Sequence, residues 1–181
     1  MRKRFGIGLN EVVVVWLGRF TKVKRPDRVI DIAKELPEIS FVMAGGGELM
    51  DSVWESAPSN VKLVGFQSKN DMWSIADVGL CTSDSEGMPL ALIEAQMAGV
   101  PVVSTDVGSV SEIVEDYKTG RLAGRESHQL TAALKDVITS ISKSERMQKA
   151  SRTRALKLFS ADVMAEAHLR LYRQVLGKVE R

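Results

Sequence analysis

Residues 77–104 read DVGLCTSDSEGMPLALIEAQMAGVPVVS, and the expected architecture of the whole chain follows from them. The letters predict a buried strand from Val78, a polar loop, a helix of good helix formers and a second buried strand from Val100. Pro89 suits the first position of that helix, and Gly99 suits its left-handed end. Two parallel strands joined by one helix form a βαβ unit, the repeating element of parallel sheets.

The same alternation of apolar runs and helical patterns continues on both sides of this unit. Further strands are expected at 11–18, 39–44, 61–64 and 121–123. Further helices are expected at 26–36, 48–56, 68–76, 111–116, 127–139, 143–158 and 160–176, with Ser68 as the cap of the third. The pattern predicts an α/β fold: one domain over residues 1–181, with a doubly wound, Rossmann-like parallel sheet of about six strands and helices on both faces.

Composition narrows the class of protein. The 181 residues are 44% hydrophobic, enough for one domain with a sizeable core. A net charge of +2 permits an anionic ligand but does not indicate a nucleic-acid partner. The single cysteine, Cys81, lies in a predicted buried strand, so we expect it to be a core residue of a cytoplasmic protein. No early apolar run approaches the ~20 residues of a membrane span, and we expect no signal peptide.

The junction of loop and helix near residue 89 is a candidate anion site. The backbone amides of Met88, Leu90 and Ala91 lack intrahelical partners there, and the helix dipole adds positive charge. Glu86 and Glu94 flank this junction. A carboxylate would repel a phosphate, so we expect each glutamate to face hydroxyl groups, such as those of a sugar or ribose. The alternative is ordinary: Glu86 as a partner of the helix dipole and Glu94 as an exposed helix residue.

Glu86, seven intervening residues and Glu94, with Gly87 and Pro89 between them, resemble the signature of retaining nucleotide-sugar glycosyltransferases with the GT-B fold. The resemblance extends from about Val12 to Leu176. It implies that the chain is the C-terminal, donor-binding half of such an enzyme, of the kind that builds polysaccharides and glycolipids. On this resemblance we expect the N-terminal, acceptor-binding domain or subunit to be absent from this chain and the isolated chain to be inactive.

The resemblance also implies roles for individual residues. The donor diphosphate is held by Arg19, Lys24, Gly87, Met88, Leu90 and Ala91. Ribose is bound by Glu94, and Glu86 is the catalytic residue that faces the sugar, with no covalent nucleophile assigned. Without the resemblance, the spacing of Arg19 and Lys24 favours two cations of a solvated loop. Arg25 stands where the family usually has glycine, which either adds a phosphate contact or crowds the site.

Two further stretches follow predicted strands. Gly65 and Phe66 are implied to contact the base, although Phe66 also suits an ordinary core position. Gly45 and Gly46 are implied to line the donor cleft. They do not form a dinucleotide fingerprint, because Met50 stands where that motif needs its third glycine.

Downstream, Ser109 replaces the second glycine that the family usually has near the donor sugar. The three tryptophans, Trp16, Trp54 and Trp73, are expected in the core. No metal site and no cofactor are expected, since His128 and His168 lack companions at ligand spacing. The donor is expected to be a uridine or guanosine diphosphate sugar.

Two questions remain open at the level of sequence. The chain is either a transferase half, a nucleotide-sugar-binding module without activity, or a sugar-nucleotide epimerase of related fold. A run of basic residues is either a solvated helix face or a peripheral contact with anionic membrane: Lys143, Arg146, Lys149, Arg152, Arg154 and Lys157.

Overall fold

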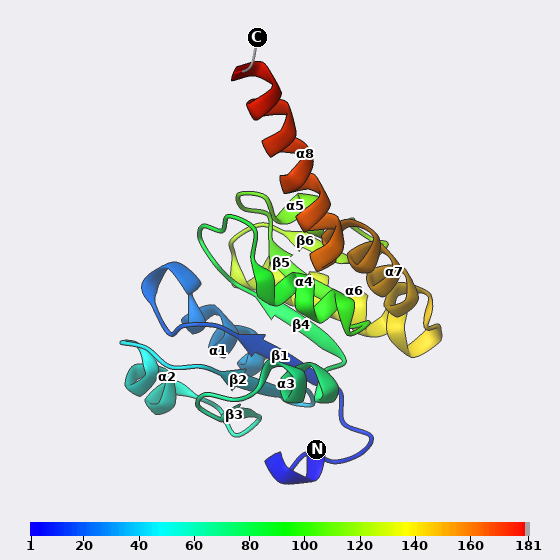
Figure 1. The fold of residues 1–181 in the computed structure, drawn as a ribbon. Coiled ribbons are helices and arrows are strands. Elements are labelled where there is room, and N and C mark those ends of the chain that lie inside the picture. The colour runs from blue at the N-terminus through cyan, green and yellow to red at the C-terminus, as the bar shows by residue number, and fades with distance from the viewer. Residues whose placement is uncertain (180–181) are drawn as a thin grey trace.

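The sheet in the computed structural model, which describes residues 1–179, has six parallel strands in the order β3-β2-β1-β4-β5-β6 (Figure 1). The strands are β1 (Val13–Leu17), β2 (Ser40–Ala44), β3 (Val61–Leu63), β4 (Val78–Cys81), β5 (Val102–Thr105) and β6 (Gly120–Ala123). The expected α/β fold is confirmed. The strand order reverses between β1 and β4, and ligands of open α/β sheets bind at the carboxyl ends of strands near such a reversal.

Helices cover both faces of the sheet. They are α1 (Pro26–Glu35), α2 (Met50–Ser56), α3 (Lys69–Ile75), α4 (Leu90–Met97), α5 (Val110–Ile113), α6 (Ser127–Lys143), α7 (Arg146–Phe159) and α8 (Ala161–Val179). Short 3-10 helices lie at Arg2–Phe5 (η1) and Lys22–Lys24 (η2).

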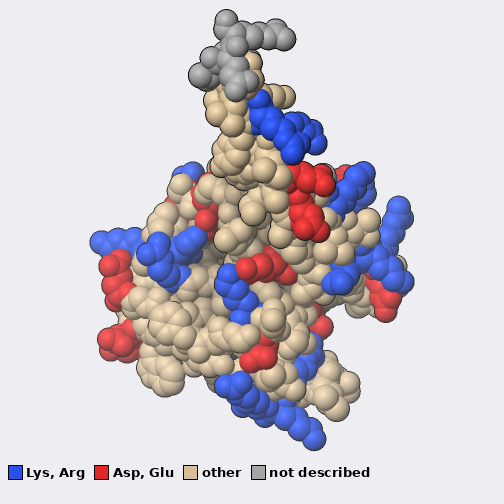
Figure 2. Space-filling view, viewed as in Figure 1, with Lys and Arg blue, Asp and Glu red and all other residues tan. Residues whose placement is uncertain are grey.

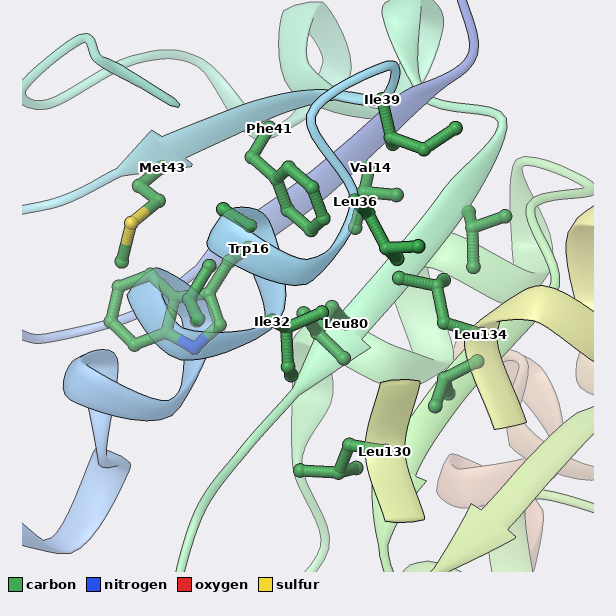
Figure 3. Close-up of a cluster of buried hydrophobic side chains, with 14 of the residues drawn as sticks. Val14, Trp16, Ile32, Leu36, Ile39, Phe41, Met43, Leu80, Leu130 and Leu134 are labelled. Atoms are coloured by element: carbon green, nitrogen blue, oxygen red, sulfur yellow. The ribbon is translucent and has the colours of Figure 1, made fainter. Parts of the chain in front are cut away.

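Strand β1 explains why the central strands read as unbroken apolar runs. Val14 and Trp16 belong to the apolar cluster under α1 and α6, together with Ile32 and Leu134 (Figure 3). Val13 and Val15 belong to the cluster under α3 and α4, on the other face. Successive side chains of the strand point to opposite faces, and both faces are buried. Every position is therefore apolar, which is the pattern of a covered parallel sheet.

Several expected boundaries move when tertiary contacts are considered. Pro89 is the residue before α4, with extended backbone, so the helix starts at Leu90 rather than at the proline. Gly99 has φ of +80° and ends the helix as expected. Ser68 precedes α3, but its side chain makes no capping hydrogen bond. Helix α6 extends to Lys143, four residues beyond the predicted end.

The tryptophans divide. Trp16 and Trp73 are buried, whereas Trp54 on α2 is 66% exposed, so the expectation of a core position is wrong for it. Cys81 is buried as expected.

Helix α8 projects away from the sheet and its covering helices (Figure 1). Its exposed apolar side chains are Val163, Met164, Leu169, Leu171, Tyr172, Val175 and Leu176. None of the helices in residues 1–179 has the length and apolar character needed to cross a membrane.

Candidate functional site

The loops that follow the strands contact one another at the carboxyl edge of the sheet, and we call them the edge loops: residues 18–25, 45–47, 64–67, 82–89 and 106–109. Backbone hydrogen bonds join them in pairs. The Phe20 amide donates to the Gly46 carbonyl (3.0 Å), and the Gly45 amide donates to the Gly65 carbonyl (2.8 Å). The Asp84 amide donates to the Val23 carbonyl (2.8 Å). The predicted site residues on these loops therefore lie along one continuous edge.

Two glycines make these loop contacts sterically feasible. A Cβ on Gly108, whose φ is +56°, would lie 1.7 Å from the Glu86 carbonyl oxygen. A Cβ on Gly45, whose φ is +134°, would lie 1.9 Å from the Gly18 carbonyl oxygen. Both positions require glycine because protein backbone occupies the space. Ser109 has φ of −94°, so serine is unstrained there, and the close approach occurs one residue earlier.

Glu86 lies four residues before α4 and is almost enclosed, with its side chain 9% exposed. Its Oε1 accepts hydrogen bonds from Lys24 Nζ (2.6 Å) and Ser83 Oγ (2.6 Å). The Cys81 thiol lies 3.7 Å from the same oxygen, and burial raises the pKa of that thiol. Glu86 is thus a fixed carboxylate with a cation beside it, and it lies outside the first turn of the helix.

Thr82 and Arg28 hold the Glu86 loop against the loop that carries Lys24. The Thr82 hydroxyl accepts from Trp16 Nε1 (3.1 Å) and lies 2.9 Å from the Lys24 carbonyl oxygen, to which it can donate. The buried Arg28 donates to the Thr82 carbonyl (2.8 Å) and pairs with Asp84 (2.7 Å). These contacts fix the position of Lys24 relative to Glu86.

Charged side chains also stabilise the contact between the Glu86 loop and the Lys24 loop. Burial raises the pKa of Asp84, but the hydrogen bond and charge of Arg28, with those of Arg25, outweigh burial and lower that pKa below its ordinary value. Arg25 has φ of +50°, the backbone conformation for which glycine is favoured. Its guanidinium is held by Asp27 (2.6 Å) and Asp84 (3.3 Å). Arg25 is therefore paired with acidic side chains of α1 and of the Glu86 loop.

The other residues expected at the diphosphate lie on the same edge. Arg19 follows β1 and is exposed, with no ion pair to any acidic side chain of residues 1–179. The amides of Met88, Leu90 and Ala91 make no hydrogen bond within the part of the chain that the structure describes. Free amides, an unpaired arginine and Lys24 are groups that bind phosphate oxygens.

Glu94, in the second turn of α4, is paired with a residue that the sequence did not reveal. Lys69 Nζ, at the start of α3, lies 2.7 Å from Glu94 Oε1. The Glu94 side chain is 31% exposed, but its Oε2 is buried and has no hydrogen-bond partner in the described residues. Glu94 is therefore more constrained than an ordinary exposed helix residue.

Phe66 is 84% exposed, so a core position is wrong for it. Its ring lies over Gly46, where an added Cβ would come 2.9 Å from the ring. An exposed aromatic face beside backbone groups of the edge loops suits a nucleobase. Its contact with a base stays a prediction.

Four contributing residues escaped sequence reasoning: Arg28, Lys69, Thr82 and Ser83. Asp84, two residues before Glu86, was the one signal of a nearby cation. The ion pair of Lys69 and Glu94 joins positions 25 residues apart, and no local pattern predicts it.

The basic residues of α7 have mixed surroundings. Arg154 donates to the Glu112 carbonyl (2.8 Å), and Lys149 pairs with Glu145 (3.0 Å). Figure 2 shows Lys and Arg interspersed with Asp and Glu on the right of the molecule, where α7 lies. A solvated face accounts for this distribution, and membrane contact stays a prediction. No three His, Cys, Asp or Glu side chains of residues 1–179 form a group that could hold a metal ion.

The fold is that of one half of a GT-B glycosyltransferase. The chain belongs to the family described as glycosyl transferases group 1, whose model matches residues 1–154.

Curated relatives include D-inositol 3-phosphate glycosyltransferases of Mycobacterium tuberculosis and Mycobacterium bovis. They are 30% identical over 194 residues, covering 98% of this chain and 40% of those proteins. The chain thus spans less than half of their length.

Solved structures agree on the fold. Anabaena Alr3699/HepE in complex with UDP-glucose matches with a TM-score of 0.88 at 21% identity, covering 96% of this chain and 51% of that one. Sucrose-phosphate synthase from Thermosynechococcus elongatus matches with a TM-score of 0.87 at 23% identity, covering 98% and 48%.

Proposed function

We propose that this chain is the donor-binding half of a retaining glycosyltransferase. It binds a nucleoside-diphosphate sugar at the edge loops, and it transfers the sugar when an acceptor-binding half completes the cleft. The observation that carries the proposal is the meeting of Lys24, the enclosed Glu86 and the free amides of Leu90 and Ala91 at one edge of the sheet. The relatives are transferases, and HepE was solved with UDP and with UDP-glucose. The ligands of HepE favour a uridine diphosphate donor for this chain.

Chemistry at this edge would be electrostatic. Glycosyl transfer through a transition state of oxocarbenium character adds negative charge to the departing diphosphate. Arg19, Lys24 and the amides at the start of α4 would stabilise that charge, because they are in place before the reaction. The Lys24 ammonium has three donors, so it can hold Glu86 and still donate to a phosphate oxygen.

Glu86 would act on the sugar side. Its Oε1 is held by Lys24 and Ser83, so its orientation is fixed without the ligand. A fixed carboxylate beside the reacting carbon stabilises positive charge that develops there. Glu94 would bind the ribose hydroxyls, and Phe66 with Gly65 would contact the base.

Ligand-observed NMR against UDP, GDP, UDP-glucose and GDP-mannose tests donor binding. This chain alone would supply one half of the proposed cleft, so we expect saturable binding in the micromolar-to-millimolar range, about −4 to −8 kcal/mol. No response from any of the four ligands would overturn the proposal.

Transfer assays separate the proposal from its alternatives. The chain alone should transfer no sugar, because nothing holds an acceptor in reacting geometry, and adding an acceptor-binding half should restore transfer. Binding that never leads to transfer would identify a module without activity. Isomerisation of the donor without an acceptor would identify an epimerase.

A further inference from the structure

A groove of about 610 Å³ runs between α3 and α4. Lys69 and Glu94 both line it, and Trp73 and Asn70 line it as well. Lys69 is the first residue of α3, and its ammonium reaches across to Glu94 on the neighbouring helix. The contact therefore determines where the Glu94 carboxylate points.

The two oxygens of Glu94 have unequal surroundings. Oε1 accepts the hydrogen bond from Lys69 Nζ at 2.7 Å. Oε2 is buried and accepts no hydrogen bond from residues 1–179. A buried carboxylate oxygen without a donor loses solvation that nothing replaces, which is unfavourable. The Glu94 side chain as a whole is 31% exposed, so a rotation of its carboxylate would bring Oε2 to a ligand hydroxyl and remove that cost.

Charge is the second consideration. A bare carboxylate near a diphosphate site would repel the ligand. The Lys69 ammonium cancels the charge of Glu94 at close range, while a free oxygen remains as an acceptor. The pair can therefore accept from a hydroxyl without opposing the phosphates.

We propose that Lys69 is a positioning residue that makes the site selective for ribose. It holds Glu94 so that Oε2 takes a hydroxyl of the nucleotide ribose, and donors without ribose hydroxyls bind poorly. The inference rests on the proposed function, since it places ribose at Glu94. The competing interpretation treats the pair as a surface ion pair with no part in binding.

Isothermal titration calorimetry with UDP and 2′,3′-dideoxy-UDP distinguishes the two. The parent chain should prefer UDP by about one to two orders of magnitude, the range for losing hydrogen bonds to a charged acceptor. Lys69→Met should reduce this preference to about threefold or less, because the Glu94 carboxylate is no longer oriented. Lys69→Arg should restore most of the preference, since a cation again reaches Glu94. Lys149→Met, which removes a lysine from the Glu145 pair on α7, is the matched control and should leave the preference unchanged.

The outcomes separate the two claims. A parent chain that binds neither nucleotide overturns the proposed function and this inference with it. A Lys69→Met chain that binds UDP and keeps the parental preference overturns the inference alone. Equal weakening of both nucleotides also overturns it, because Lys69 would then act on the diphosphate. Melting temperatures of all variants identify any loss that comes from misfolding.

Discussion

Glu86 and Glu94 each pair with a lysine from another segment, at 2.6 Å and 2.7 Å, yet their surroundings differ. Glu86 is nearly enclosed, and its Oε1 also accepts from Ser83. Glu94 is about one-third exposed, and its Oε2 has no partner among residues 1–179. Similar residue pairs can thus have different roles, since one is built into the fold and the other has an acceptor to offer.

The contacts around each pair explain the difference. Around Glu86, the Arg28 and Thr82 contacts join the two loops that follow the neighbouring strands β1 and β4. Around Glu94, a single ion pair joins two helices across a groove. We therefore expect changes near Glu86 to reduce stability and changes near Glu94 to act mainly on binding.

The largest expected effect concerns backbone space beside Glu86. Gly108→Ala would place a Cβ against the Glu86 carbonyl and force a left-handed backbone on alanine. We expect a loss of about 3 kcal/mol or more in the free energy of unfolding, from strain and steric overlap together. Urea denaturation measures it. Gly87→Ala is the control, since a Cβ there has nothing within 4 Å, and a similar loss in both variants would contradict the account.

Removing each lysine compares the two pairs directly. Lys24→Met leaves an enclosed carboxylate without its cation, and we expect a loss of about 2–3 kcal/mol, below the range for fully buried pairs because Lys24 is partly exposed. Lys69→Met should cost about 1 kcal/mol or less. Denaturant titration of both variants checks this. Adding Glu86→Gln to Lys24→Met should recover much of the loss, and equal losses for the two lysines would make the two sites equivalent.

A smaller effect tests whether the ion pairs of Asp84 stabilise the loop that carries Glu86. The pKa of Asp84 is lowered because Arg28 and Arg25 outweigh its burial, so its contribution is fully present above about pH 4 and disappears as the pH falls through the lowered pKa. Asp84→Asn should lose about 1 kcal/mol at neutral pH, and the difference from the parent should shrink in acid. Unfolding measured from pH 7 to pH 3 checks the sign. A difference that grows in acid would contradict it, and Asp106→Asn, at the exposed residue that follows β5, serves as the control.

Much of the fold could be predicted from the sequence because burial on both faces produces a local pattern. Apolar runs in β1 and β4 predict covered strands, and Gly99 predicts the end of α4. Pro89 was placed one position too far into the helix, since both the first helical residue and the residue before it accept a proline. Trp54 was misplaced because size and apolarity predict burial only where another element covers the side chain.

The candidate site was less predictable for a physical reason. Local patterns predict which charged residues follow the ends of strands, so Lys24 and Glu86 were expected on one edge of the sheet. The contact between them, and that between Lys69 and Glu94, join segments that are distant in sequence and depend on packing. The role of Gly108 likewise follows from the position of the Glu86 carbonyl, which no local pattern records.

The central claim is that Glu86 contacts the donor sugar and Glu94 binds the ribose. Calorimetric titration of Glu86→Gln and Glu94→Gln with UDP and with UDP-glucose tests it directly, because both ligands carry ribose and only one carries the sugar. Glu94→Gln should weaken both ligands alike, by about one to two orders of magnitude. Glu86→Gln should weaken UDP-glucose and leave UDP within about threefold of the parent. Unchanged UDP binding by Glu94→Gln, or equal loss of both ligands in Glu86→Gln, would contradict the assignment.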